Sequence, residues 1–257
     1  MMKKMVTSIG ISLSLSGYLY AVDIKSAEDA VNIAGKQRMF TQRMLKDYAM
    51  VGMNNTFGNP GEDLKKTMDA FSDHLASLKG YTKDAEIKKS LEKVEALWMP
   101  IQKELHSTPS VEQAQKLQED LEKLLKASDE ATKLFAKASG KEAGEMVNIA
   151  GRQRMLSQRM ASLYMLKVWG VEDPKFKTKL TDTLTLFKTS LQKLETSSLN
   201  NDKTKTLLAK VKRSFVFFEM MNRSKSKFVP TLIYKKSNDI LQNMDKVTQL
   251  YTQNNAK

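Results

Sequence analysis

An internal repeat constrains this 257-residue chain more than any other feature of its sequence. Residues 31–44 read VNIAGKQRMFTQRM and residues 147–160 read VNIAGRQRMLSQRM, so 11 of 14 positions are identical at an offset of 116. Weaker matches continue at this offset toward the ends of both copies, where Asp129 aligns with Asp245. A chain that carries the same unusual segment twice is expected to contain two copies of one fold.

The amino-terminal segment, residues 1–21, has the pattern of a secretory signal peptide. Lys3 and Lys4 precede an apolar run over 5–20, and we expect cleavage after Ala21. An uncleaved membrane anchor is the alternative, but the run is short and is interrupted by Ser and Gly. We therefore expect a soluble periplasmic protein with one module at 23–139 and a second at 140–257.

The pattern of apolar residues and helix breakers predicts an all-α fold. Gly and Pro clusters and apolar spacings of three and four residues indicate four helices per copy, and short connections make neighbouring helices antiparallel. The expected helices are 26–53, 61–79, 84–106, 110–138, 141–169, 174–196, 201–225 and 229–254. At the junction, residues 139–142 either restart a helix through a capping box or soften one continuous rod. We expect two tandem four-helix bundles stacked end to end through a long shared helix.

Composition argues against catalysis and against a metal or cofactor. The chain has no cysteine, so it lacks thiol nucleophiles and thiolate ligands. Its two histidines, His74 and His106, belong to no ligand-spaced cluster and are expected on helix surfaces or ends. The carboxylates alternate with lysines on solvated faces, so no acid and base pair stands out. No catalytic residue, metal site or cofactor is predicted.

The chain is strongly basic. Its net charge is +13, and cleavage after Ala21 removes two lysines and no acid, which leaves +11. Such a charge favours anions or acidic partners, and residues 223–227 form the most one-sided basic segment. Nucleic acid is not an expected partner, since the protein is predicted to be exported and no recognition motif accompanies the lysines.

The repeated helix has two distinct faces. At 100° per residue, Ile33, Phe40 and Met44 share the face that enters the core of their own bundle. A second face points away from this core, although Gly in a helix interior costs about 1 kcal/mol relative to Ala. Such a glycine is best explained where a backbone or a ligand approaches closely. The face comprises Asn32, Gly35, Met39, Gln42 and Arg43, with Arg38 at its edge.

Two interpretations of this second face stay open. In the first, Gly35 and Gly151 only permit close helix packing, and the arginines pair with carboxylates. In the second, an arginine fork holds a small planar oxyanion beside the glycine through charge-assisted hydrogen bonds. The ligand-binding residues predicted by the second interpretation are Gly35, Arg38, Met39, Gln42, Arg43, Gly151, Arg154, Met155, Gln158 and Arg159.

The motifs AGKQRMFTQRM and AGRQRMLSQRM resemble the signature of PilJ-type sensor modules, found at the amino terminus of type IV pilus chemotaxis transducers. They are also similar to the P-box of NarX/NarQ-type nitrate sensor kinases. The resemblance implies helical bundles that sense nitrate or related oxyanions at a dimer interface. It assigns the anion-contacting roles to Arg38 and Arg154 and to Gly35 and Gly151.

We therefore expect an exported sensor that binds a small oxyanion, nitrate or nitrite, and signals through a membrane sensor kinase or chemoreceptor. In end-to-end bundles, Arg38 and Arg154 are too far apart to share one anion. Each would need a copy from a second chain, as in a homodimer, or one from another receptor. The alternative is a ligand-free interaction module that docks helices of a receptor or pilus component. If this face were sealed beneath the remaining helices of its own module, with every guanidinium matched to an internal acid, the ligand hypothesis would have no foundation.

Overall fold

A computed structural model describes residues 22–140, 142–223 and 229–253, and every regular element in these ranges is an α-helix. The all-α prediction is therefore confirmed, whereas the predicted signal peptide, residues 1–21, lies outside the described residues. No helix in the described part of the chain is long and apolar enough to cross a membrane. The helices are α1 (Ala27–Gly52), α2 (Pro60–Tyr81), α3 (Ala85–Leu105), α4 (Val111–Ser139), α5 (Glu142–Trp169), α6 (Phe176–Glu195), α7 (Asp202–Arg223) and α8 (Pro230–Gln253).

Local sequence signals set several of the helix starts. The side chains of Ser26, Asp84 and Ser110 accept hydrogen bonds from backbone N–H groups in the first turns of α1, α3 and α4. Pro60 occupies the first turn of α2, where its missing N–H costs no hydrogen bond. These caps explain why the helix bounds agree closely with those expected from the sequence.

The helices of each repeat pack on one another in the same pattern, and the buried apolar side chains of both repeats form one continuous core. In the first repeat, α1 contacts α2 and α4 while α3 contacts α4, and α5 to α8 repeat these contacts in the second. Phe71 packs on Trp98 with ring centroids 4.5 Å apart, and the equivalent Phe187 and Phe215 are 4.4 Å apart. Both repeats therefore bury an aromatic pair at the same place, so the duplication extends to their interiors.

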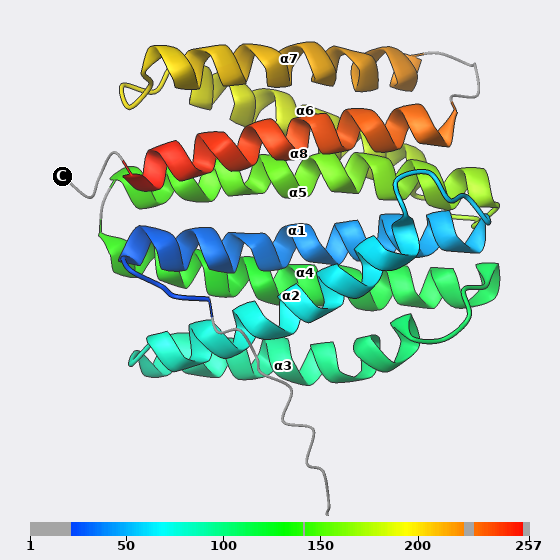
Figure 1. Cartoon of the computed structure of the whole chain (residues 1–257), viewed down its shortest axis with the longest axis horizontal. Coiled ribbons are helices and arrows are strands. Elements are labelled where there is room, and N and C mark those ends of the chain that lie inside the picture. Colours follow the sequence, from blue (N-terminus) through cyan, green and yellow to red (C-terminus); the bar gives the residue numbers. More distant parts are fainter. Residues whose placement is uncertain (1–21, 141, 224–228, 254–257) are drawn as a thin grey trace, which may run out of the picture.

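The repeats lie side by side, so the predicted end-to-end stack with a long shared helix is wrong. Figure 1 shows α4 ending and α5 beginning at the same end of the molecule. Helix α4 stops at Ser139, and Gly140 has a left-handed φ of 64°, a conformation that suits glycine. A Cβ on Gly144 would overlap the Ser139 hydroxyl. The two glycines thus permit a tight reversal where a continuous helix was expected.

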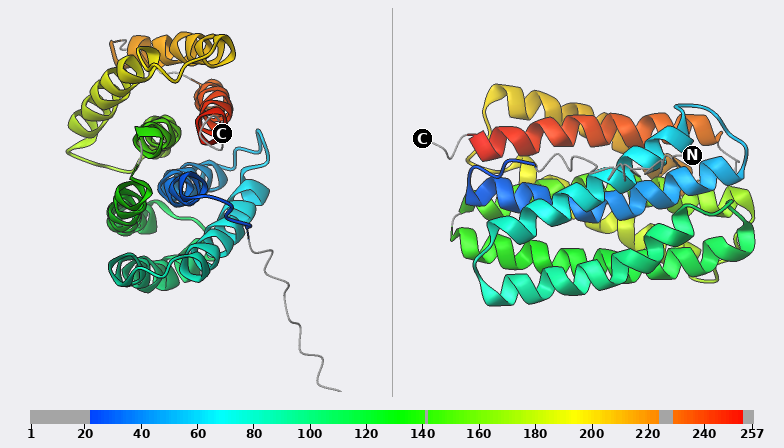
Figure 2. Two further views of the ribbon diagram at one scale, coloured as in Figure 1. Left: turned by 90° about the vertical axis from the view of Figure 1, so that its left-hand side faces the viewer. Right: turned by 60° about the horizontal axis from the view of Figure 1, so that its bottom comes forward.

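Helices α1 and α5 form the most extensive contact between elements, and they run parallel (Figure 1). The end-on view in Figure 2 shows them at the centre of the molecule, with the α2–α3 and α6–α7 hairpins outside. Gly35 faces Gly151 across this interface, so the helices pair at the 116-residue offset of the repeat. Equivalent residues consequently meet each other. We call this α1–α5 interface the seam.

Candidate functional site

Two glycines face each other in the seam. A Cβ added to Gly35 would lie 4.0 Å from the Cα of Gly151, and the reverse distance is 3.9 Å. Larger side chains at both positions would hold the two helix backbones apart. The glycines predicted to face a close neighbour therefore do so, and the neighbour is the other repeat.

Arg38 is completely buried beside this contact. Its Nη1 donates to Oδ1 of Asp129 in α4 at 2.6 Å, and its Nη2 donates to the backbone oxygen of Asn148 in α5 at 3.1 Å. The guanidinium thus joins the carboxylate of its own repeat to the leading helix of the other repeat.

Arg154 repeats this arrangement in the opposite direction. It is also completely buried, and its Nη1 lies 2.6 Å from Oδ1 of Asp245 in α8. Its Nη2 donates to the backbone oxygen of Asn32 in α1 at 3.3 Å. The two arginines therefore form a two-fold pattern of cross-links over the seam.

The two guanidinium groups converge on the glycine contact. A Cβ on Gly35 would lie 3.3 Å from Nη2 of Arg38 and 3.5 Å from Nη2 of Arg154. The expectation that Arg38 and Arg154 lie too far apart within one chain is therefore wrong. It assumed end-to-end bundles, whereas the side-by-side packing brings both arginines to one place.

Burial and neighbouring charges act against each other on these groups. Burial lowers the pKa of Arg38 to about 10, against the opposing pull of Asp129. Burial also lowers the pKa of Arg154. Desolvation alone would raise the pKa of Asp129, but Arg38 and Lys133 outweigh it and hold that pKa below its usual value. At neutral pH Arg38 is therefore charged and its partner Asp129 is ionised.

Two further cations stand at the edges of the same cluster. Nη2 of Arg152 in α5 lies 3.9 Å from Oδ1 of Asp129 in α4. Burial lowers the pKa of Lys36, and Asp245 and Arg154 act on it electrostatically. Lys36 and Arg152 are equivalent positions that differ between the repeats, so each repeat places a different cation beside the carboxylate of the other. Lys133 also pairs with Asp129, at 2.7 Å, and Asp29 acts electrostatically on Lys36. With Arg38 and Arg154, five cations therefore surround Asp129 and Asp245.

Part of the hydrogen-bonding capacity of the cluster is unused among the described residues. The buried Nε atoms of Arg38 and Arg154 donate to no acceptor there, and the buried Oδ1 atoms of Asn32 and Asn148 receive no donor. The same atoms are unmatched in both repeats. An acceptor that reached either Nε would find a charged donor in a site of low polarity.

The remaining predicted site residues are two methionines, two glutamines and two arginines, and none of them touches the glycine contact in the way Arg38 and Arg154 do. Met39 and Met155 are buried, contrary to the expectation that this face is open, because the other repeat covers it. Gln42 and Gln158 lie further along the seam. Oε1 of Gln42 accepts from Ser162 at 3.2 Å, and Nε2 of Gln158 donates to the backbone oxygen of Ser237 at 3.2 Å.

Arg43 and Arg159 do not join the glycine contact. Nη2 of Arg43 lies 2.8 Å from Oδ2 of Asp63 in α2, and Nη1 of Arg159 lies 2.8 Å from Oε2 of Glu122 in α4. Each of the four predicted arginines thus has a carboxylate partner, as the packing interpretation requires. This meets one of the two conditions against the ligand hypothesis; the other is not met, because the second repeat, and not the helices of the same module, covers the face. Of the ten predicted residues, only the two glycines and Arg38 and Arg154 converge on one point.

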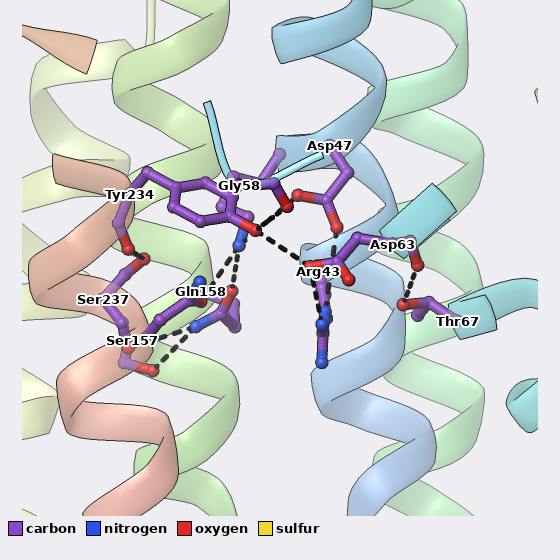
Figure 3. A network of polar contacts seen from close by, with 11 residues as sticks. Arg43, Asp47, Gly58, Asp63, Thr67, Ser157, Gln158, Tyr234 and Ser237 are labelled. Carbon is purple, nitrogen blue, oxygen red and sulfur yellow. Dashed lines mark hydrogen bonds and ion pairs between the residues drawn. The ribbon is translucent and has the colours of Figure 1, made fainter. Parts of the chain in front are cut away.

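A second polar cluster lies further along the seam than Arg38 and Arg154, and it includes the predicted residues Arg43 and Gln158 (Figure 3). The sequence did not indicate Lys46 and Asp47 at its centre. Lys46 is completely buried, and its Nζ donates to Oε1 of Gln158 at 2.9 Å and to Oδ1 of Asn238 at 3.1 Å. The same Nζ lies 4.1 Å from the centre of the Tyr234 ring. Lys46 thereby ties α1 to both α5 and α8.

Asp47 is the fully buried carboxylate of this cluster, which also contains Asp63. Its oxygen lies 3.4 Å from Nζ of Lys46, and burial raises its pKa to about 6 despite Lys46 and Arg43. The equivalents of Lys46 and Asp47 in the second repeat are Ser162 and Leu163, so the repeat alignment gave no signal for the cluster. By contrast, Asp129 and Asp245 align, and this match could have identified the arginine partners.

His74 corrects one further expectation. It is buried in α2 instead of lying on a helix surface, and its ring centre is 5.1 Å from that of Phe40. Burial lowers its pKa to about 4, so it is neutral at physiological pH. His106 lies at the C-terminal end of α3 and is exposed, as expected. No group of three potential metal ligands occurs in the described residues.

Comparison with known proteins identifies one family. The family model described as PilJ, the N-terminal region of type IV pili methyl-accepting chemotaxis transducers, matches residues 23–129 and 135–215. The two matched segments each include one copy of the repeated motif. No curated protein and no solved structure matches the chain significantly.

Proposed function

Since this chain belongs to the PilJ family of chemotaxis transducer N-terminal domains, we propose that it is a sensor module that binds a small oxyanion between Arg38 and Arg154. One observation carries the proposal: both buried guanidinium groups converge on the Gly35–Gly151 contact within a single chain. Nitrate and nitrite are the first candidates, because a planar oxyanion matches the planar donor fork of arginine.

The charges of the seam support an anionic ligand. Arg38, Arg154, Lys36, Arg152 and Lys133 surround Asp129 and Asp245, and Asp29 is the further carboxylate that acts on Lys36. The cations outnumber the carboxylates, and like charges repel strongly where water is excluded. Asp129 and Asp245 occupy the Nη1 atoms and leave both Nε atoms without an acceptor among the described residues. A small anion would neutralise part of the excess charge and use these donors.

Binding at this place would couple directly to helix position. The Nη2 atoms donate to backbone oxygens of Asn148 and Asn32 on opposite helices. An anion that draws the guanidinium groups toward itself would compete with these cross-links and move α1 relative to α5. A ligand that prefers one arrangement shifts the population toward it, which is the basis of sensing.

The proposed signalling route is a partner protein in the envelope. Residues 1–21 would direct export to the periplasm, where a membrane sensor kinase or chemoreceptor would receive the change in the seam. Since both arginines come from one chain, a homodimer is not required for the site. The proposed stoichiometry is one anion per chain.

Calorimetric titration with nitrate, nitrite and chloride tests the ligand. We expect the wild-type chain to bind an oxyanion more tightly than chloride, and Arg38→Lys and Arg154→Lys to weaken binding at least tenfold, because lysine retains the charge but loses the fork. Arg159→Lys is the matched control, since this arginine lies in the same motif but pairs with Glu122. No heat with any oxyanion, or equal losses in all three variants, would contradict the proposal.

A ligand-free interaction module is the second candidate, favoured by the carboxylate partner of every motif arginine. In it, the seam would open to admit a helix of a receptor or pilus component. Partner binding would then be equally strong in oxyanion-free buffer. Gly35→Leu would weaken it more than Arg38→Ala, because the glycine contact would form the docking surface.

A further inference from the structure

The outward face of α7 combines cations with exposed apolar side chains. An open groove of about 590 Å³ lies along this helix. All of its lining residues come from α7 except Glu195 of α6, and most of them belong to one stripe at helical spacing. Val216 is 44% exposed, and Met220, one turn further along, is 61% exposed. We call this stripe the α7 face, and it comprises Lys205, Ala209, Lys212, Arg213, Val216 and Met220.

The positive charge of the protein is concentrated on this side. Helices α6 and α7 contain ten Lys and Arg residues and four Asp and Glu residues, whereas α2 and α3 contain seven and eight. Both hairpins occupy equivalent outer positions, and α7 forms one edge of the molecule (Figures 1 and 2). The two repeats have therefore kept one fold and diverged in surface charge.

One ion pair shows this divergence most directly. In the first repeat, Lys79 of α2 pairs with Glu95 of α3 at 2.6 Å. At the equivalent place, Glu195 of α6 pairs with Lys212 of α7 at 3.1 Å. The polarity is reversed, so the same cross-hairpin contact places the cation on α7. The ion pair can link the two helices of the hairpin with the cation on either helix. The packing of the hairpin therefore does not explain why the cations lie on α7.

Other equivalent positions follow the same trend. Where α7 has Ala209 and Arg213, α3 has Glu92 and Ala96. Val216 corresponds to Met99 of α3, which is 61% exposed. An exposed apolar residue is therefore present on both faces. The first repeat therefore provides a face of the same shape with acidic residues among its cations.

We propose that the α7 face docks on the surface of an anionic lipid bilayer. A stripe of lysine and arginine with apolar residues between them matches a lipid interface, where cations meet headgroups and apolar side chains enter the boundary region. The groove is formed almost entirely by one helix, so it is a poor cradle for a partner helix but suits a broad surface. Lys205, Lys212 and Arg213 would face the headgroups, and Val216 and Met220 would insert between them.

Flotation of the mature chain, residues 22–257, with phosphatidylglycerol-containing vesicles and with pure phosphatidylcholine vesicles tests the proposal. We expect binding to the anionic vesicles only. A triple variant, Lys205→Gln, Lys212→Gln and Arg213→Gln, should bind roughly 100-fold more weakly, since one cation near an anionic surface contributes about fivefold. Val216→Ser with Met220→Ser should also weaken binding, and 0.5 M salt should reduce it.

A matched control on the first repeat separates the α7 face from general basicity. The variant Lys88→Gln, Lys89→Gln and Lys103→Gln removes three positive charges from α3 and should retain binding within about threefold. All altered side chains are exposed, so unchanged thermal unfolding verifies the fold of each variant. Equal losses in the α3 and α7 triple variants would overturn the proposal. So would the absence of vesicle binding, which would favour an acidic protein as the occupant.

Discussion

Gly35 packs against Gly151 so closely that a Cβ on the first would lie 4.0 Å from the Cα of the second. These residues are equivalent in the two repeats, so the contact joins one surface patch to its own copy. Separate subunits make such self-complementary interfaces through two-fold symmetry. Here the duplication places both halves of the interface in one chain, so the seam forms within a single polypeptide and needs no second subunit.

Gly52 is predicted to be a steric requirement of the seam. A Cβ at this position would overlap the Trp169 ring at the end of α5. Gly52→Ala should therefore lower the free energy of unfolding by about 1–3 kcal/mol through overpacking. Gly80→Ala is the control, since a Cβ there meets nothing within 4 Å and should stabilise α2 by up to about 1 kcal/mol. Urea unfolding of both variants measures the difference, and equal effects would contradict the prediction.

Lys46 and Asp47 are predicted to depend on each other. Lys46→Ser leaves the buried Asp47 without its closest cation and should cost about 3–5 kcal/mol of stability. Adding Asp47→Leu copies the Ser162 and Leu163 of the second repeat and should recover part of this loss. Denaturant unfolding of the two single variants and the double variant gives the coupling energy. Purely additive losses would show that the two residues act independently.

His74 is predicted to make the protein less stable in acid. Its pKa is lowered from 6.5 to about 4 by burial, so between these values the unfolded chain binds a proton that the folded chain does not. Stability should fall as the pH drops from about 6.5 to 4, by up to about 3 kcal/mol from this residue. The comparison of wild type with His74→Asn in urea at several pH values isolates the effect. A variant with the wild-type slope would refute it.

Asp47 is predicted to act in the opposite sense over nearly the same range. Burial raises its pKa from 3.8 to about 6, so the folded chain retains a proton that the unfolded chain has released. Its contribution to stability should therefore decrease as the pH rises from about 4 to 6. Relative to wild type, Asp47→Asn should gain stability across this interval. Unfolding curves at pH 4, 5 and 6 provide the test, and a constant difference would exclude the proposed titration.

Much of the local structure could be predicted because its causes are local. Helix bounds follow from caps such as Ser26 and Asp84, and from apolar residues at helical spacing. The core positions of Phe40 and Met44 follow from the same periodicity. The carboxylate partners of Arg38 and Arg154 could also have been predicted, since Asp129 and Asp245 align at the repeat offset. The cluster around Lys46 had no such signal, because Lys46 and Asp47 occur in the first repeat only and the partners of Lys46 lie in α5 and α8 of the second.

The sequence by itself determined the duplication, the helices and the glycine and arginine faces that required a close neighbour. It did not determine the neighbour, because a break at Gly140 and a softened continuous helix give the same local pattern. Only the tertiary structure decided that the chain reverses there and lays α5 along α1. The reason is physical: the choice depends on which nonlocal surfaces are buried together, and the Gly35–Gly151 contact exists only after both repeats have packed.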